Sequence, residues 1–157
     1  MGTGYGIKCA DCNYSIRYLE GVGMFYDDVS VFYNNSQNDK PWIHLLVKNK
    51  RIKDKAVNLL SNGALPDSEY GHELYACPKC NRLTNRFYFK LVSSKGEYEP
   101  DYRCYKCNTK LLRVELQPHK KRDFAKIVFK NNTDKKWNCP KCGCEKLIYD
   151  NCVTNWD

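Results

Sequence analysis

The cysteines are the residues of this 157-residue chain with the clearest capacity for chemistry, and there are ten of them. Random placement of ten cysteines would give on the order of one Cys-x-x-Cys pair, so a larger number is informative. The chain has four such pairs, Cys9/Cys12, Cys77/Cys80, Cys104/Cys107 and Cys139/Cys142. Paired thiolates are typical ligands of a tetrahedral metal ion, so the pattern predicts two four-cysteine sites, each with one structural zinc ion.

The residue after each pair supports this prediction. A metal-binding knuckle wraps the backbone around the ion, and its turn needs a residue that tolerates positive φ, which Gly and Asn do best. All four pairs supply one, namely Asn13, Asn81, Asn108 and Gly143. The expected unit is therefore a knuckle, a turn and a strand.

Two other chemistries compete with zinc. Disulfides within Cys-x-x-Cys pairs are strained, and their redox versions normally belong to a thioredoxin-like βαβ pattern that this sequence lacks. Iron in a rubredoxin-like site is the closer rival. Both metals accept four thiolates in a tetrahedron, so the sequence leaves the choice between them open.

The pairing of the four knuckles has two solutions. A predicted hairpin, with a strand at 87–92, a turn at 93–96 and a return at 98–103, would bring Cys77/Cys80 beside Cys104/Cys107 and leave Cys9/Cys12 to join Cys139/Cys142. The sequential alternative joins neighbouring pairs along the chain, and a second predicted hairpin, 111–116 against 126–130, favours it. We expect the first scheme, with Cys144 and Cys152 as free thiols, although Cys152 is an alternative ligand beside Cys139 and Cys142.

The other elements fit a small, metal-stapled α+β fold in which β-hairpin zinc ribbons carry a short helical insert. Runs rich in β-branched and aromatic residues predict strands at 14–19, 86–92, 111–116 and 146–149. Apolar residues at helical spacing predict a helix over 39–62, with Asp39 as its cap, Pro41 in its first turn and Asn62-Gly63 as its stop. The expected domains are an N-terminal knuckle and strand at 1–26, the helical insert at 27–75 and a basic ribbon region at 76–157.

Positive charge is concentrated in the second half of the chain. The net charge is +8, of which residues 1–76 contribute −1 and residues 77–157 contribute +9. Two filled tetrathiolate sites would lower the total to about +4 and leave that half basic. Phosphate contacts are therefore expected from the cations there, with Phe87, Tyr88, Phe89, Tyr98, Tyr102 and Tyr105 as exposed rings for bases. The candidate cations are Arg82, Arg86, Lys90, Arg103, Lys106, Lys120, Lys121, Arg122 and Lys126.

The four knuckles resemble the zinc-ribbon superfamily, which occurs in RNA polymerase subunits, transcription factors, ribosomal proteins and adaptors. The opening 4–14, Gly-Tyr-Gly-Ile-Lys-Cys-Ala-Asp-Cys-Asn-Tyr, followed by Leu-Glu-Gly-Val-Gly-Met at 19–24, also resembles a group of uncharacterised bacterial proteins with several such knuckles. That resemblance implies an N-terminal knuckle, a helical insert and further knuckles. It implies no particular function, because ribbon folds serve many.

These features predict a non-enzymatic binding module. All-thiolate sites are closed to an activated water, and no Ser/His/Asp grouping or carboxylate pair stands out. Nucleic acid is the expected partner. The alternative is a protein partner that binds the helical insert of residues 39–62 and the exposed aromatics, which mutation of Trp42 or Leu46 would test. Iron-based electron transfer is a third possibility. Met1 to Lys8 lack the pattern of a signal peptide and no run is long enough to span a membrane, so we expect a cytoplasmic protein with no membrane or small-molecule ligand.

Overall fold

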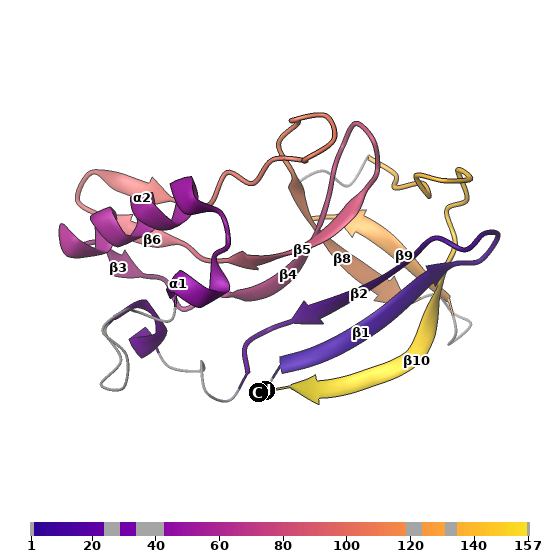
Figure 1. Ribbon diagram of the computed structural model, residues 1–157, viewed down its shortest axis with the longest axis horizontal. Coiled ribbons are helices and arrows are strands. Elements are labelled where there is room, and N and C mark those ends of the chain that lie inside the picture. Colours follow the sequence, from indigo (N-terminus) through magenta and orange to yellow (C-terminus); the bar gives the residue numbers. More distant parts are fainter. Residues whose placement is uncertain (1, 24–28, 34–42, 119–123, 131–134, 157) are drawn as a thin grey trace.

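The computed structural model describes residues 2–23, 29–33, 43–118, 124–130 and 135–156, and these are mostly β-strands (Figure 1). A seven-stranded antiparallel sheet has the order β2-β1-β10-β9-β8-β4-β5. Its strands are β1 (Gly2–Cys9), β2 (Ser15–Glu20), β4 (Gly71–Ala76), β5 (Leu83–Tyr88), β8 (Leu112–Pro118), β9 (Phe124–Phe129) and β10 (Leu147–Trp156). A smaller antiparallel sheet, β3-β6-β7, contains β3 (Leu65–Pro66), β6 (Leu91–Ser93) and β7 (Gly96–Tyr98).

The two ends of the described chain pair with each other. Strand β1 lies between β2 and β10, with Gly2 opposite Trp156 and Cys9 opposite Leu147. Three of the first five residues of β1 are glycines, which are usually unfavourable inside a strand. The sequence analysis predicted no strand here. The backbone of β1 is nevertheless enclosed, because it has a bonded neighbour on each side.

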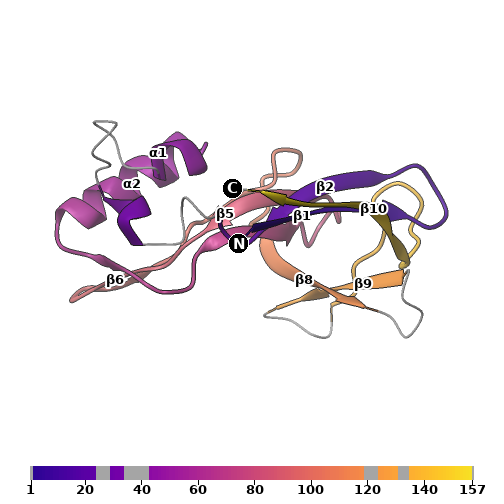
Figure 2. The ribbon, with the colours of Figure 1, turned by 90° about the horizontal axis from the view of Figure 1, so that it is seen from below.

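The large sheet curls until its two edge strands meet. In Figure 2 the β8–β9 hairpin lies on the opposite side from β1, β2 and β10, and β2 packs against β4 and β5. The Asn85 side chain joins the edges: its Oδ1 accepts from the Leu19 amide (3.2 Å), while Nδ2 donates to the carbonyls of Leu19 (2.8 Å) and Glu73 (2.9 Å). Beyond β2, Gly21 and His72 exchange two backbone hydrogen bonds of 3.0 and 2.7 Å.

The fold is therefore a nearly closed sheet and does not divide clearly into β-hairpin ribbons. The α+β class and the two cysteine groups of the sequence analysis are confirmed, but the expectation of ribbon architecture is not. Pairing between the chain ends builds one large sheet that the local hairpin signals did not indicate. The division at residues 26 and 75 stays a prediction.

We expect Asn85→Leu to lower the free energy of unfolding by about 3 kcal/mol, because leucine leaves three partly buried backbone groups without their partner. In a domain of this size the thermal midpoint should fall by about 10 °C. Calorimetry of the metal-loaded protein measures the shift. Asn58→Leu, on the exposed face of a helix, is the matched control and should move the midpoint little; equal midpoints for both variants would contradict the bridging role of Asn85.

Alternate side chains of β4 enter two separate cores, because successive residues of a strand point to opposite faces. Tyr75 and Cys77 join one core, which also holds Phe87, Phe89 and Leu91. The second core contains Leu74 and Ala76 of the β4 segment together with Ile7, Ile127, Phe129, Trp137 and Leu147. Each core includes cysteines from one of the two groups described below.

The helical insert is shorter and more broken than predicted. A 3-10 helix, η2 (Val29–Phe32), precedes two α-helices, α1 (Ile43–Leu46) and α2 (Lys50–Ser61). The actual cap of α2 is Asn49, whose Oδ1 accepts from the Ile52 amide at 3.1 Å. Helix α2 ends at Asn62 and Gly63 as predicted, with a φ of 84° at Gly63. Asp39, Pro41 and Trp42 lie outside the described residues.

Most strand predictions are confirmed. The predicted runs at 14–19, 111–116, 126–130 and 146–149 fall on β2, β8, β9 and β10, and the turn at 93–96 joins β6 to β7. The run at 86–92 is split into β5 and β6, which belong to different sheets. Within the described part of the chain, no helix has the length and apolar character needed to cross a membrane.

Candidate metal centres and basic groove

The eight knuckle cysteines gather into two groups of four. Their sulfur atoms lie within 4.8 Å of one another in each group, which we name the terminal site and the central site. The terminal site is Cys9, Cys12, Cys139 and Cys142, and the central site is Cys77, Cys80, Cys104 and Cys107. This grouping matches the favoured pairing and contradicts the sequential one. Although the predicted 111–116/126–130 hairpin exists, it does not join the cysteines on either side of it.

The sulfur positions fit a tetrahedral ion. Sγ–Sγ separations are 3.4 Å for Cys9–Cys142 and 3.3 Å for Cys77–Cys107, with 3.6 Å for Cys12–Cys139 and for Cys80–Cys104. Four thiolates at about 2.3 Å from one ion stand about 3.8 Å apart. A disulfide needs about 2.05 Å, and the described cysteines are free thiols. Each group can therefore hold a metal ion.

Three knuckles share the expected turn. In each of them the first cysteine donates its amide to the carbonyl five residues later, and its own carbonyl accepts from the amide four residues later, as in Asn81 N–H to Cys77 O at 2.9 Å. The φ angles are 56° at Asn81, 55° at Asn108 and 80° at Gly143. Asn13 does not have positive φ, so the prediction was wrong there. In that knuckle Ala10 bonds to Lys146 of the neighbouring segment, which extends the sheet into the turn.

Backbone amides point at the sulfur atoms, as the knuckle interpretation requires. Burial and hydrogen bonding act in opposite directions on these thiols. Burial raises the pKa of Cys77 to about 12, although the amides of Cys80 and Lys79 oppose it. Hydrogen bonds with the side chain and the backbone of Thr109 lower the pKa of Cys107 to about 6. A divalent metal ion binds thiolates, so its binding to either group would release the thiol protons.

Of the two remaining cysteines, Cys144 lies outside both groups. Cys144 Sγ accepts from the Lys146 amide at 3.2 Å, and burial raises its pKa. Cys152 lies in β10, and its side chain is outside the described set. The expectation that Cys144 is a free thiol is confirmed.

Side chains beside the terminal site contact the strand that follows the first central knuckle. Trp137, two residues before Cys139, donates its indole N–H to the Asn81 carbonyl at 2.7 Å. The Leu83 amide donates to the Tyr14 hydroxyl at 3.2 Å, and the rings of Tyr14 and Trp137 lie 6.4 Å apart. The two sites are therefore joined by a rigid aromatic contact as well as by the sheet.

Three of the predicted cations meet on one surface. Arg82, Arg86 and Arg103 surround a shallow cavity beside the exposed ring of Tyr105, over which the Arg82 guanidinium lies at 4.9 Å. Lys90 does not join them, because it pairs with Glu97 (2.9 Å) and Asp67 (3.8 Å). Lys106 and Lys126 are exposed elsewhere, and Lys120, Lys121 and Arg122 lie outside the described residues.

A larger cavity of about 480 Å³ continues from this surface, and we name it the basic groove. Its walls include Lys48, Arg86 and Arg103 with Leu46, Phe87 and Tyr102, and among the described residues that line it there is no carboxylate. His72 also lines it, and burial together with the charge of Lys48 lowers its pKa to about 4, so it is neutral at pH 7. Sequence reasoning missed Lys48, because only the tertiary fold brings it to Arg86.

The prediction that six aromatic rings are exposed is wrong for most of them. Phe87, Tyr88 and Phe89 are at most 2% exposed, and Tyr102 is buried with its hydroxyl donating to the Phe87 carbonyl at 2.6 Å. Tyr98 is half-buried. Only Tyr105, at 74% exposure, offers a ring to a ligand. The small cores need these aromatics for packing, which a strand-by-strand inspection of the sequence does not reveal.

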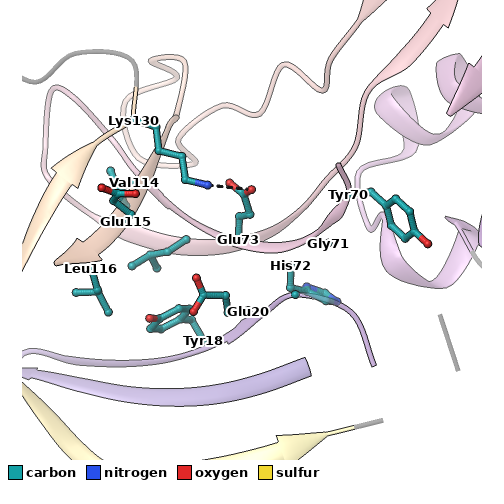
Figure 3. Close-up of a pocket in the computed structure, with 12 residues that line it drawn as sticks. Tyr18, Glu20, Tyr70, Gly71, His72, Glu73, Val114, Glu115, Leu116 and Lys130 are labelled. Carbon is teal, nitrogen blue, oxygen red and sulfur yellow. Dashed lines mark hydrogen bonds and ion pairs between the residues drawn. The ribbon is translucent and has the colours of Figure 1, made fainter. Parts of the chain in front are cut away.

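A third cavity, of about 190 Å³, lies between β2, β4 and β8 (Figure 3). It is lined by Glu20, Glu73 and Glu115 with Lys130, and Glu73 Oε1 lies 3.1 Å from the Lys130 amine. The same Oε1 lies 3.2 Å from Arg113. These contacts form an ion-pair network that supports the junction of the curled sheet.

Comparisons with protein-family models, with curated proteins and with solved structures found no match, so the interpretation of these sites rests on their own geometry.

Proposed function

We propose that this chain is a non-enzymatic module in which two zinc ions fix a curled β-sheet and the basic groove binds nucleic acid. The observation that carries the proposal is the meeting of Arg82, Arg86 and Arg103 beside the exposed Tyr105, with Lys48 further along the groove. Cations next to an accessible aromatic ring are typical of surfaces that bind nucleic acid, because the cations contact phosphates and the ring stacks on a base. The four-thiolate sites leave no open coordination position for an activated water, which supports a structural role for the metal.

The charge around the groove supports an anionic partner. Taken together, the described residues that line the basic groove and the shallow cavity beside Tyr105 contribute four cations and no carboxylate. Arg103 has one acidic neighbour, Asp101 at 3.0 Å, and both side chains are about half exposed, so water weakens that pair. The adaptor role stays a second proposal: Leu46 is half-buried against the core and Trp42 lies outside the described residues, so neither gives this role support of its own.

Salt-dependent binding tests this function. Fluorescence anisotropy with a labelled strand of about 12 nucleotides, between about 50 and 200 mM salt, should give a Kd that rises steeply with salt. Arg86→Gln/Arg103→Gln should reduce the slope of log K against log salt by about 0.7, because the phosphate that these two guanidiniums hold loses its counter-charge. Lys95→Gln/Lys126→Gln removes the same charge outside the groove and should reduce it far less. If the zinc-loaded protein binds neither DNA nor RNA at low salt, the proposed function is wrong.

A further inference from the structure

We infer that the basic groove takes one unpaired nucleotide, with its phosphate at Arg86 and Arg103 and its base against Leu46. This inference rests on the proposed function and specifies its ligand as a single strand. It goes beyond a general affinity for nucleic acid because it requires a base to leave any duplex and enter the groove.

The cations of the groove come from three different parts of the fold. Lys48 lies between α1 and α2, Arg86 is on β5, and Arg103 directly precedes Cys104 of the central site. Arg86 donates one N–H to the Asn85 carbonyl at 3.2 Å, and its guanidinium lies 5.9 Å from the Tyr102 ring centre. A guanidinium carries five N–H donors, so this anchored Arg86 retains donors for a phosphate.

The groove also has an apolar part. Leu19 and Leu46 line it, together with Phe87 and Tyr102, which are at most 4% exposed. The volume of about 480 Å³ lies in the range of small-molecule sites, which combine an apolar wall with a few polar groups. A ligand with an anionic end and a flat apolar part satisfies both halves of the lining, and a nucleotide is such a ligand. In a duplex the bases are stacked and paired, so only an unpaired base can reach Leu46.

The side-chain amide oxygens in the groove have little freedom to read the base. Both ends of the Asn85 amide are used in the contacts with Leu19 and Glu73, and Asn49 Oδ1 accepts from Ile52. We therefore expect weak preference among the four bases.

The neighbouring nucleotide can stack on the Tyr105 ring, because Arg86 and Arg103 line both the basic groove and the shallow cavity beside that ring. Stacking on such a ring is worth about 1–3 kcal/mol per base and tolerates any base.

Competition experiments on the zinc-loaded full chain test this inference. A single strand should bind at least about tenfold more tightly than a hairpin duplex of the same charge. Uridine monophosphate should displace the labelled strand at a lower concentration than inorganic phosphate does. Lys48→Glu should weaken strand binding about tenfold, whereas Lys95→Glu, the same charge reversal on the β6–β7 turn, should change it less than about twofold. Thermal midpoints of both variants establish that they are folded.

Different experimental results would overturn this inference and the proposed function. If duplex and single strand bind equally, or if uridine monophosphate competes no better than inorganic phosphate, no base enters the groove and the inference is overturned, while the nucleic-acid function stands. If no strand and no duplex binds at low salt, both are overturned.

Discussion

Exhaustive chelation at pH 7 is expected to abolish the folded structure and to release two metal ions per chain. Structural zinc contributes about 10–16 kcal/mol of apparent binding free energy in small folds, and a whole domain is stable by only about 5–15 kcal/mol. Each core includes cysteines of one site, so losing the ions leaves thiols in both. Far-UV circular dichroism before and after chelation measures the loss, and elemental analysis of the released ion gives its number and identity.

A variant of Cys144 provides the control for chelation. Cys144 lies outside both groups, so Cys144→Ser should retain two ions and a thermal midpoint close to that of the parent chain. A chelated protein that contains no metal and melts at the original temperature would contradict the stabilising role of the ions. Iron in the released fraction, with a coloured protein before chelation, would replace zinc in the proposal while leaving that role intact.

Local chemistry in the sequence was sufficient to predict the knuckles. Cysteine spacing and the residue after each pair depend on a few neighbouring atoms, and the turns at Asn81, Asn108 and Gly143 adopt the expected backbone. Asn13 departs from the pattern, and in its knuckle the Ala10 amide donates to the carbonyl of Lys146, a residue far away in the sequence. Such a contact depends on the tertiary fold, and the local pattern contains no signal for it.

The sheet was harder to predict than the knuckles for the same reason. Strand β1 is glycine-rich and has no periodic apolar pattern, yet pairing with β2 and β10 makes it central. The Asn85 bridge results from closure of the sheet, and Lys48 reaches the basic groove only through the packing of the helical segment on it. Burial of Phe87 and Phe89 likewise follows from the placement of the helices, which a count of aromatic residues cannot show.

Replacement of one cysteine in each site should expose a different set of thiols. We expect Cys104→Ser to lose about one equivalent of metal and to make Cys77, Cys80 and Cys107 reactive toward an alkylating reagent. The terminal-site cysteines should stay protected. Cys139→Ser should give the reverse pattern, with Cys9, Cys12 and Cys142 reactive. Mass spectrometry of the alkylated peptides identifies the thiols, and labelling of Cys139 and Cys142 in Cys104→Ser would support the sequential pairing instead.

The two replacements should also open different parts of the fold. Cys104 belongs to the core of α2 and β6, so its loss should increase amide hydrogen exchange in those elements first. Cys139 belongs to the core of Ile7, Ile127 and Leu147, so its loss should release β1 and β10. The Trp137–Asn81 and Tyr14–Leu83 hydrogen bonds connect the terminal site to the β4–β5 hairpin. Because of them, we expect each variant to show a smaller rise in hydrogen exchange in the elements around the site that keeps its four cysteines. Uniform exchange throughout the chain in either variant would show that the sites stabilise one cooperative unit and not two coupled cores.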